Sequence, residues 1–446
     1  MEKKPLELVD KSAWTSLHTL MFLSLAVGFF MWGVIASLAP LIYSSINNVL
    51  FLLTPTFTTL AGNLILPFFS DNRLGRKTTF FITMGLYSLG TILLIVAAVL
   101  AGFNTNNLAN MPYIALITIG IILGVLGVEG EVPVMLSYTA EMMPLKYRDQ
   151  MLILAPNFDN IGAMVAALVG YITYSASNSF TIELLSIGLV ALLGIITAIV
   201  IRLLLPESVR WLTAKGRVGE AEMEAERLAR EVNDVRENKI GKKVGLGFSY
   251  LFLALIGVSQ YLTYGLMAYV VADFYFKGST LAFIVFIANL GASIAGFIAA
   301  LLINKIRTRV FALFSYVGGT LSMIPIILLT MNFNLVMFYI LLAVNMLFSE
   351  FGWATRTIYE PVLMPNNLRA FMIGLVRIVP VTLYAISVYV ISIYLQNNLT
   401  SYLLYNLILW AIGGVTSVIW YFEGIDVNFV SLEEIHAKEN TSTVNK

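Results

Sequence analysis

The sequence predicts an all-α membrane protein with twelve transmembrane helices in two pseudo-symmetric six-helix bundles, and three observations lead to that fold class. Of the 446 residues, 59% are hydrophobic and only 12% are charged, whereas soluble proteins carry about 25% charged residues. Apolar runs that can cross a hydrocarbon core of about 30 Å as helices recur from end to end. A shift of 221 residues superposes Pro144 on Pro365, Arg148 on Arg369 and Glu129 on Glu350.

The twelve spans fall, in chain order, at 16–42, 49–70, 78–101, 112–138, 151–175, 180–205, 247–273, 279–303, 309–331, 334–357, 370–395 and 400–422. Six of them form an N-terminal bundle over residues 1–205, and six form a C-terminal bundle over 247–422. Charge-dense, helix-forming residues predict a cytoplasmic helical linker over 206–246, and a cytoplasmic tail follows over 423–446.

The orientation of the spans follows from Lys and Arg, which gather in alternate loops and at both termini. On the other side of the membrane, Lys277 is the only basic residue of the loops. Cytoplasmic loops of membrane proteins carry an excess of Lys and Arg. We therefore expect a multi-pass protein of the cell membrane with both termini in the cytoplasm.

Several kinds of site are not expected. The chain has no cysteine, and its two histidines, His18 and His436, are far apart in sequence, so a metal site is not predicted. A phosphate-binding loop of the GxxxxGK[ST] type is missing, which argues against direct drive by ATP hydrolysis. Because the basic residues sit on short loops between spans, nucleic-acid binding is not predicted. We expect no enzyme, no cofactor, and a monomer in the lipid bilayer.

Four motifs carry a resemblance to a known family. SDNRLGRKTT (70–79) resembles the signature loop of the major facilitator superfamily, and PESVRWL (206–212) and EGIDVNFVSLEEI (423–435) resemble the sugar-porter branch of that superfamily. GVEGEVPVMLSYTAEMMP (127–144) is similar to a stretch of metabolite:proton and phosphate:proton symporters. The resemblance implies the major facilitator fold, with a substrate site between two halves that alternately open to either side of the membrane.

The same resemblance implies a cytoplasmic gate, in which ion pairs across the two halves form when that side is shut. Gly75 allows a tight turn, and Asp71 can accept hydrogen bonds from a helix N-terminus of the opposite half, while Arg76 is expected to stay at the aqueous surface. The alternative is that these residues are topology anchors and loop caps. The predicted gate residues are Asp71, Gly75, Arg76, Glu141, Arg148, Glu207, Arg210, Arg356, Glu360, Arg369 and Glu423.

Ionisable residues inside spans are expensive and are therefore functional candidates. Arg356 and Glu360 are spaced i,i+4, so we expect them to neutralise each other. The remaining set holds four acids and one base, Glu129, Glu131, Asp159, Glu350 and Arg377. One guanidinium cannot balance four carboxylates, so either the acids line a wet cavity or some carry a proton at neutral pH. Both outcomes suit coupling of protonation to transport.

Geometry separates two of these acids. Glu129 and Glu131 are two positions apart, about 200° around a helix, so they face different directions. We expect Glu131 to be the proton-linked group, and Glu129 to point with its repeat partner Glu350 toward the interface between halves. Arg377 either pairs with one of these acids or binds an anionic or hydroxylated substrate. Structural pairing is the alternative for all three acids.

Uncharged polar and aromatic residues inside spans suit a polar substrate, although such residues also join helices to one another in membranes. The candidates for substrate binding are Asn157, Asn160, Gln260, Tyr261, Tyr264, Asn289, Asn345 and Trp353.

Together these features predict a secondary active transporter, a proton-coupled symporter of a small polar metabolite such as a sugar, a polyol or an organic acid. Its partners are that substrate, protons and the lipid bilayer. A facilitative uniporter is one alternative, because the first span (GFFMWGV, 28–34) lacks the acid that many proton-coupled relatives carry. A non-transporting sensor that keeps the carrier fold is the other.

Overall fold

The protein is seen here in a computed structural model, which describes residues 3–229, 231–232, 237–240, 242 and 244–436. Eleven helical segments of the described chain are long and apolar enough to cross a membrane. One of them, Val49–Ala101, contains two spans, α5 (Val49–Phe69) and α6 (Gly75–Ala101), joined by a π-helical turn, η1 (Ser70–Leu74). The structure therefore holds a long helix for each of the twelve predicted spans.

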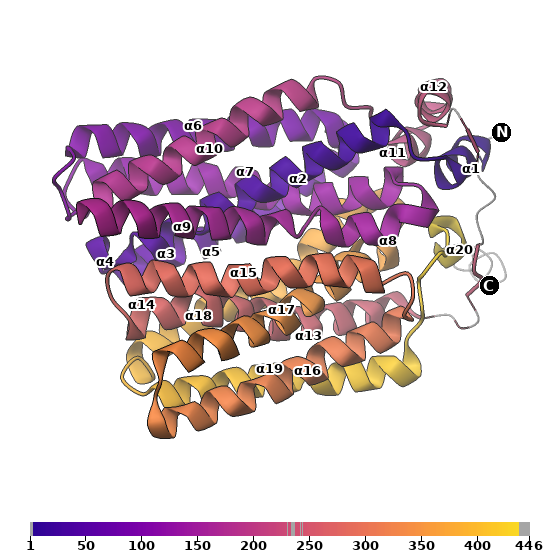
Figure 1. Cartoon of the computed structure of the whole chain (residues 1–446). Helices are drawn as coiled ribbons and strands as arrows, with labels where there is room; N and C mark the ends of the chain where they lie inside the picture. Colours follow the sequence, from indigo (N-terminus) through magenta and orange to yellow (C-terminus); the bar gives the residue numbers. More distant parts are fainter. Residues whose placement is uncertain (1–2, 230, 233–236, 241, 243, 437–446) are drawn as a thin grey trace.

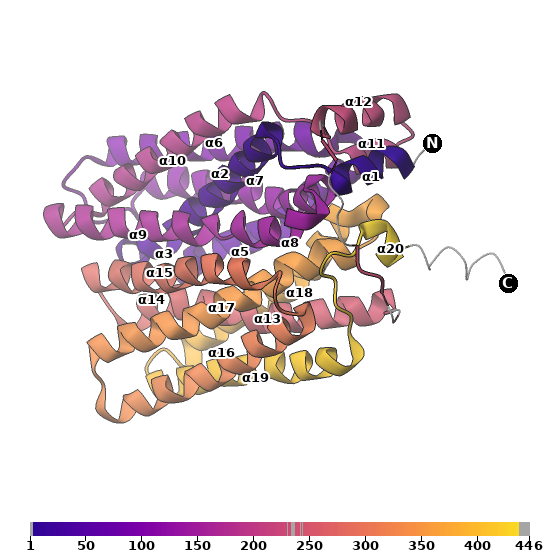
Figure 2. The ribbon, with the colours of Figure 1, turned by 45° about the vertical axis from the view of Figure 1, so that its right-hand side comes forward.

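The helices form two bundles that lie against each other (Figures 1 and 2). The N-terminal half contains, besides α5, η1 and α6, the helices α2 (Ser16–Ala36), α3 (Leu38–Leu41), α4 (Tyr43–Ile46), α7 (Tyr113–Met142), α8 (Leu145–Leu154), α9 (Phe158–Ser177) and α10 (Phe180–Arg202). The C-terminal half contains α13 (Leu246–Gly265), η2 (Leu266–Val270), α14 (Val271–Tyr275), α15 (Ser279–Leu302), α16 (Thr308–Leu329), η3 (Thr330–Asn332), α17 (Leu335–Leu363), η4 (Asn366–Leu368), α18 (Arg369–Tyr394) and α19 (Leu399–Glu423).

The internal repeat has a structural counterpart at the ends of α7 and α17. Each helix is followed by a Met-Pro pair, Met143-Pro144 after α7 and Met364-Pro365 after α17. Both methionines are extended, with φ and ψ of −81° and 138° for Met143 and −87° and 142° for Met364. A proline disfavours the helical conformation of the residue before it, so the two halves end these helices in the same way.

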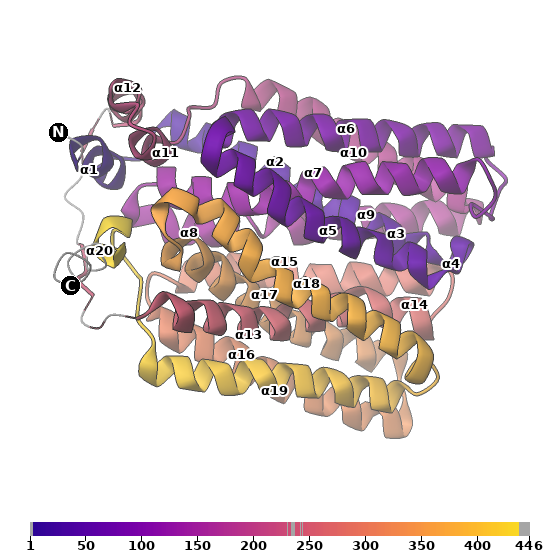
Figure 3. The same cartoon turned by 180° about the vertical axis from the view of Figure 1, so that it is seen from behind.

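Four helices make most of the contact between the halves. On one flank α5 packs against α18, and on the other α9 packs against α15 (Figure 3). A β-carbon at Gly374 in α18 would overlap the backbone oxygen of Asn63 in α5. Glycine at this position therefore lets the backbones of the two halves come into direct contact.

The first and the last described helix, α1 (Lys3–Lys11) and α20 (Leu432–His436), lie at the same end of the molecule, which we call the terminal face (Figure 1). Four short helices gather there, α1, α11 (Val209–Ala214), α12 (Val218–Leu228) and α20. Two of them, α11 and α12, belong to the stretch for which the sequence predicts a helical linker. Of the predicted tail, residues 437–446 lie outside the described residues.

Candidate functional site

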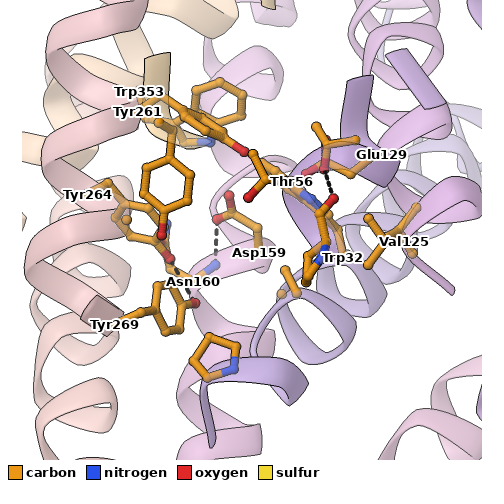
Figure 4. A pocket seen from close by; sticks show the side chains of 18 of the residues that line it. Trp32, Thr56, Val125, Glu129, Asp159, Asn160, Tyr261, Tyr264, Tyr269 and Trp353 are labelled. Carbon is orange, nitrogen blue, oxygen red and sulfur yellow. Dashed lines mark hydrogen bonds between the residues drawn. The ribbon is translucent and has the colours of Figure 1, made fainter. Parts of the chain in front are cut away.

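A cavity lies between the two halves at the middle of the bundle (Figure 4). Helices α2, α5, α7 and α9 line it from one side, and α13, α17 and α18 line it from the other. The space between its walls, including the part that is open to solvent, is ≈ 980 Å³. Its polar and aromatic lining residues are Trp32, Thr56, Thr59, Glu129, Asp159, Asn160, Gln260, Tyr261, Tyr264, Tyr269, Glu350, Trp353 and Tyr384.

Two carboxylates from opposite halves meet at one asparagine in this cavity. The backbone N–H of Asn160 donates to Asp159, and its side-chain Nδ2 donates to Glu350 Oε2 at 2.7 Å. Asp159 and Glu350 are only 7% and 3% exposed. Among the described residues, neither carboxylate forms a salt bridge, and Glu350 Oε1 is buried without a hydrogen-bond partner.

Glu129 differs from these two acids because it has its own arginine. Arg377 Nη2 lies 2.9 Å from Glu129 Oε2, and Arg377 Nε donates to Asn63 Oδ1 at 2.7 Å. The guanidinium also lies over the rings of Trp32 and Trp353, at 5.4 Å and 5.7 Å from their centroids. Both rings line the cavity whereas Arg377 does not. Of the two alternatives for Arg377, the structure therefore realises the pairing with an acid.

The structure corrects the predicted charge balance. Arg202, at the end of α10, is 1% exposed and pairs with Glu131 inside the N-terminal half. Glu131 also accepts from the Thr83 hydroxyl. Apart from the Arg356–Glu360 pair, Arg377 was the one base expected to face the four acids, whereas Arg202 and Arg377 each pair with one of them. Glu129 and Glu131 do face different directions, and Glu131 does not line the cavity.

Five of the eight predicted substrate-binding residues line the cavity: Asn160, Gln260, Tyr261, Tyr264 and Trp353. The other three point elsewhere. Asn345 donates to Ser322 within the C-terminal half at 2.8 Å, and Asn157 donates to the backbone oxygen of Ser293 at 3.0 Å. Asn289 accepts from the hydroxyl of Tyr264 at 2.7 Å, so it orients a cavity residue without lining the cavity itself.

Three aromatic residues of the cavity, Trp32, Tyr269 and Tyr384, are not among those predicted from the sequence. Trp32 stands in the GFFMWGV stretch of the first span, which contains no acid. An aromatic residue in an apolar span has no periodicity that distinguishes a cavity wall from a lipid contact. The signal that would have found Trp32 is its indole N–H, since a polar donor inside a membrane needs a partner.

A cluster of buried charges joins the two halves at the terminal face, and we call it the gate after its predicted role. Arg76 pairs with Asp71 at 2.6 Å and with Glu141 at 2.8 Å, while Arg369 of the C-terminal half reaches Glu141 at 3.0 Å. Asp71 also accepts from the backbone N–H of Phe371 at 2.8 Å, at the start of α18 in the opposite half, as expected. Arg76 is fully buried, so its predicted place at the aqueous surface is wrong.

The tail reinforces the gate through two arginines. Arg210 pairs with Asp10 of α1 at 2.8 Å and with Glu433 of α20 at 2.9 Å. Burial disfavours the ionised form of Glu433, but the charge of Arg210 outweighs it and lowers the Glu433 pKa to about 2. Arg148 in α8 donates to the backbone oxygens of Val430 and Val427 at 2.8 Å and 3.2 Å, so it also joins the N-terminal half to the tail.

Glu207 and its neighbours hold the turn at Gly75. Glu207 accepts from the backbone N–H groups of Arg76 and Lys77, at 2.8 Å and 3.2 Å. Burial raises the pKa of Glu207 even though these donors favour its ionised form. Gly75 has a φ of +78° and faces the Glu207 carboxylate, so any side chain there would be strained and would meet that carboxylate.

Three further predicted gate residues, Arg356, Glu360 and Glu423, make their ion pairs away from the gate. Arg356 and Glu360 pair at 2.7 Å on one face of α17, as their spacing predicts, and Arg356 also donates to Gln260 at 2.8 Å within the same half. Glu423 is exposed and pairs with Lys242. The Arg356–Glu360 pair therefore holds the cavity residue Gln260. The Glu423–Lys242 pair lies at the surface of the terminal face.

On the side of the cavity that faces away from the terminal face, the contacts that the described residues make between the two halves are uncharged. There, the Ser37 hydroxyl contacts the Tyr269 hydroxyl at 3.1 Å, and the rings of Tyr43 and Phe274 meet edge to face at 6.3 Å. No salt bridge of the described residues joins the halves on that side. Among the described residues, the charged contacts between the halves are therefore concentrated at the terminal face and not on the far side of the cavity.

Comparison with known proteins identifies relatives of this arrangement. The family model described as Major Facilitator Superfamily matches residues 20–380. The solved structure of the proton:xylose symporter XylE bound to 6-bromo-6-deoxy-D-glucose is similar in fold, with a TM-score of 0.74 and 15% identity over 95% of this chain and 99% of that one. The Escherichia coli fucose:proton symporter FucP gives a TM-score of 0.58 and 16% identity over 89% and 98%.

One curated protein matches part of the sequence. A stretch of 153 residues is 31% identical to the niacin transporter NiaP of Acinetobacter baylyi. The match covers 34% of this chain and spans only 30% of the length of that transporter.

Proposed function

The chain belongs to the major facilitator superfamily and is a membrane transporter rather than an enzyme; on that premise we propose that it is a proton-coupled symporter of a small polar organic molecule. One observation carries the proposal. Asp159 and Glu350 stand in the central cavity, one from each half, and no described cation neutralises either of them.

Two uncompensated carboxylates inside a membrane protein are costly unless they bind a positive charge. A proton is the simplest such charge, and a cavity shared by both halves exposes it to each side in turn as the halves rock. We assign proton binding to the Asp159–Glu350 pair and not to Glu131, because Arg202 already neutralises Glu131. The gate would hold the cavity shut toward the terminal face, which we take as cytoplasmic from the distribution of Lys and Arg.

The names of the relatives set the first substrates to try. A thermal-shift screen of the purified protein would include xylose, fucose and niacin together with other sugars, carboxylates and amines. A hit would then be tested in proteoliposomes for counterflow, and for accumulation driven by an inward proton gradient. We expect both activities in the wild type. In Asp159→Asn and Glu350→Gln, we expect gradient-driven accumulation to be lost.

The two alternatives give different results. A uniporter would show counterflow of labelled substrate but no accumulation when a proton gradient is imposed. A sensor would bind ligand without counterflow. Glu183→Gln is the matched control, because Glu183 is a buried carboxylate without a salt bridge among the described residues and lies outside the central cavity. Loss of accumulation in this control as well would remove the case for the cavity pair.

A further inference from the structure

The cavity offers hydrogen-bonding and charge-binding capacity that no protein group uses. Glu350 is only 3% exposed, and its Oε1 has no hydrogen-bond partner in the described structure. A carboxylate oxygen is rarely left unpaired when it is buried, so a ligand that donates a hydrogen bond to Glu350 Oε1 is expected.

The charge at this site selects the sign of that ligand. Each of the other three buried acids near the cavity has an arginine of its own: Glu129 has Arg377, Glu131 has Arg202 and Glu360 has Arg356. Asp159 and Glu350, the other two acids that line the cavity, have no salt bridge among the described residues, although Asn160 holds both through hydrogen bonds. An anionic ligand would meet two carboxylates. The two guanidinium groups beside Trp353, those of Arg356 and Arg377, do not line the cavity and are paired with Glu360 and Glu129.

The aromatic walls of the cavity also favour a particular kind of ligand. Six aromatic side chains line the cavity: Trp32, Tyr261, Tyr264, Tyr269, Trp353 and Tyr384. In Figure 4, Asp159 points into the space between Trp353 and Tyr264 on one side and Trp32 on the other. Aromatic faces attract ammonium groups, and they also cover the flat apolar body of a ligand.

From these three features we propose that the central cavity binds an organic monocation, an ammonium group on a planar apolar body, with the ammonium between Asp159 and Glu350. The proposal rests on the proposed function and names its substrate class. The proposal also balances the charges in the cavity of a proton-coupled symporter. One proton and one monocation together neutralise two carboxylates, so the loaded cavity is neutral when the halves reorient, which the low dielectric of the membrane favours.

The test measures binding to purified protein in detergent at neutral pH by titration calorimetry. The probes are 2-phenylethylammonium, its uncharged analogue 2-phenylethanol, and the anion phenylacetate. We expect the wild type to bind the ammonium about tenfold or more tightly than the alcohol, and the anion most weakly, because a charged hydrogen bond to a buried carboxylate is the strongest contact on offer.

The variants assign the effect to the two carboxylates. Asp159→Asn and Glu350→Gln should each weaken ammonium binding by about tenfold or more while changing alcohol binding by about twofold at most. Glu183→Gln should bind all three probes like the wild type. Asp159→Glu and Glu350→Asp keep the charge and guard against a general loss of folding, so each should retain a preference for the ammonium.

The outcomes separate this proposal from the proposed function. Equal affinity for the ammonium and the alcohol, no ammonium binding at millimolar concentration, or an unchanged preference in both amide variants would overturn the cation proposal. Gradient-driven uptake of a neutral or anionic hit would overturn it too, while leaving the proton-coupled carrier intact. Ammonium binding that depends on Asp159 and Glu350 but gives no counterflow would instead overturn the carrier and keep the cation site.

Discussion

Arg377 of α18 and Glu129 of α7 form a salt bridge of 2.9 Å across the interface between the two halves, at the edge of the central cavity. Both side chains are almost fully buried, with exposed fractions of 1% and 4% for the two residues. The pair joins helices from opposite halves. It therefore has to be kept, exchanged or broken whenever the halves move apart at this level.

Removing one partner of this pair should be far more damaging than removing both. Glu129→Gln leaves the Arg377 charge buried without compensation, which costs about 3–5 kcal/mol in other buried pairs. We expect the double variant Glu129→Gln/Arg377→Met to recover most of that loss, because no charge is then left unpaired. Chemical unfolding of Glu129→Gln, Arg377→Met and the double variant in detergent measures the coupling. Additive losses in the double variant would show that the two residues act independently.

Removal of the Arg369–Glu141 salt bridge, which joins the two halves in the gate, should shift the protein toward a form with an open terminal face. Arg369→Gln releases Glu141 from the C-terminal half, and Arg76 then holds Glu141 within the N-terminal half. The chain has no native cysteine, so spin labels at Lys146→Cys and Lys305→Cys report the distance across this face. We expect a longer mean distance in Arg369→Gln. Glu423→Gln, which removes only an exposed pair with Lys242, should leave the distance unchanged.

Gly374→Ala tests how closely the halves must approach. The added β-carbon would overlap the Asn63 backbone oxygen, and backbone cannot move aside as a flexible side chain can. We expect the same labels to report a longer distance, together with a lower melting temperature of the closed form. Gly85→Ala is the control, because a β-carbon there meets nothing within 4 Å. If both alanine variants behave alike, close approach at Gly374 is not required.

Docking of the tail should depend on pH through His436. Its ring lies 3.2 Å from the Val362 backbone oxygen, and burial, with a smaller effect of Arg369, lowers its pKa from 6.5 to about 4. A released tail thus binds more protons than a docked one between these values. Docking should therefore be strongest above pH 6.5 and weaken as the pH falls toward 4.

Hydrogen exchange of the α20 backbone, corrected for the intrinsic pH dependence of exchange, measures this docking. His436→Gln should remove the part of this dependence that lies above about pH 5.5. Below that pH Glu433 contributes as well, because Arg210 keeps its pKa at about 2 in the docked tail, whereas a released Glu433 takes up a proton near its ordinary pKa of 4.5. A dependence that persists above about pH 5.5 in His436→Gln would point to Asp10, whose pKa burial raises and whose carboxylate also faces Arg210.

The sequence by itself determined the number of spans, their approximate ends and the two-bundle architecture. Each span needs a run of apolar residues, and each Met-Pro end needs a proline, so these features are local and can be read along the chain. The pairing of Arg356 with Glu360 and the different directions of Glu129 and Glu131 followed from helix geometry alone. The sequence also predicted that Asp71 accepts a hydrogen bond from a helix N-terminus of the opposite half. It did not identify the donor as the backbone N–H of Phe371.

Only the tertiary structure decided which charges meet. Arg202 lies 71 residues from Glu131 in sequence and Arg377 lies 248 residues from Glu129, and nothing local distinguishes an arginine at the end of a span that faces water from one that turns into the bundle. The same holds for Asn157, Asn289 and Asn345, whose amides serve contacts between helices. Whether a polar side chain in a span faces a cavity depends on the rotation of its helix against its neighbours, and packing across the whole bundle sets that rotation.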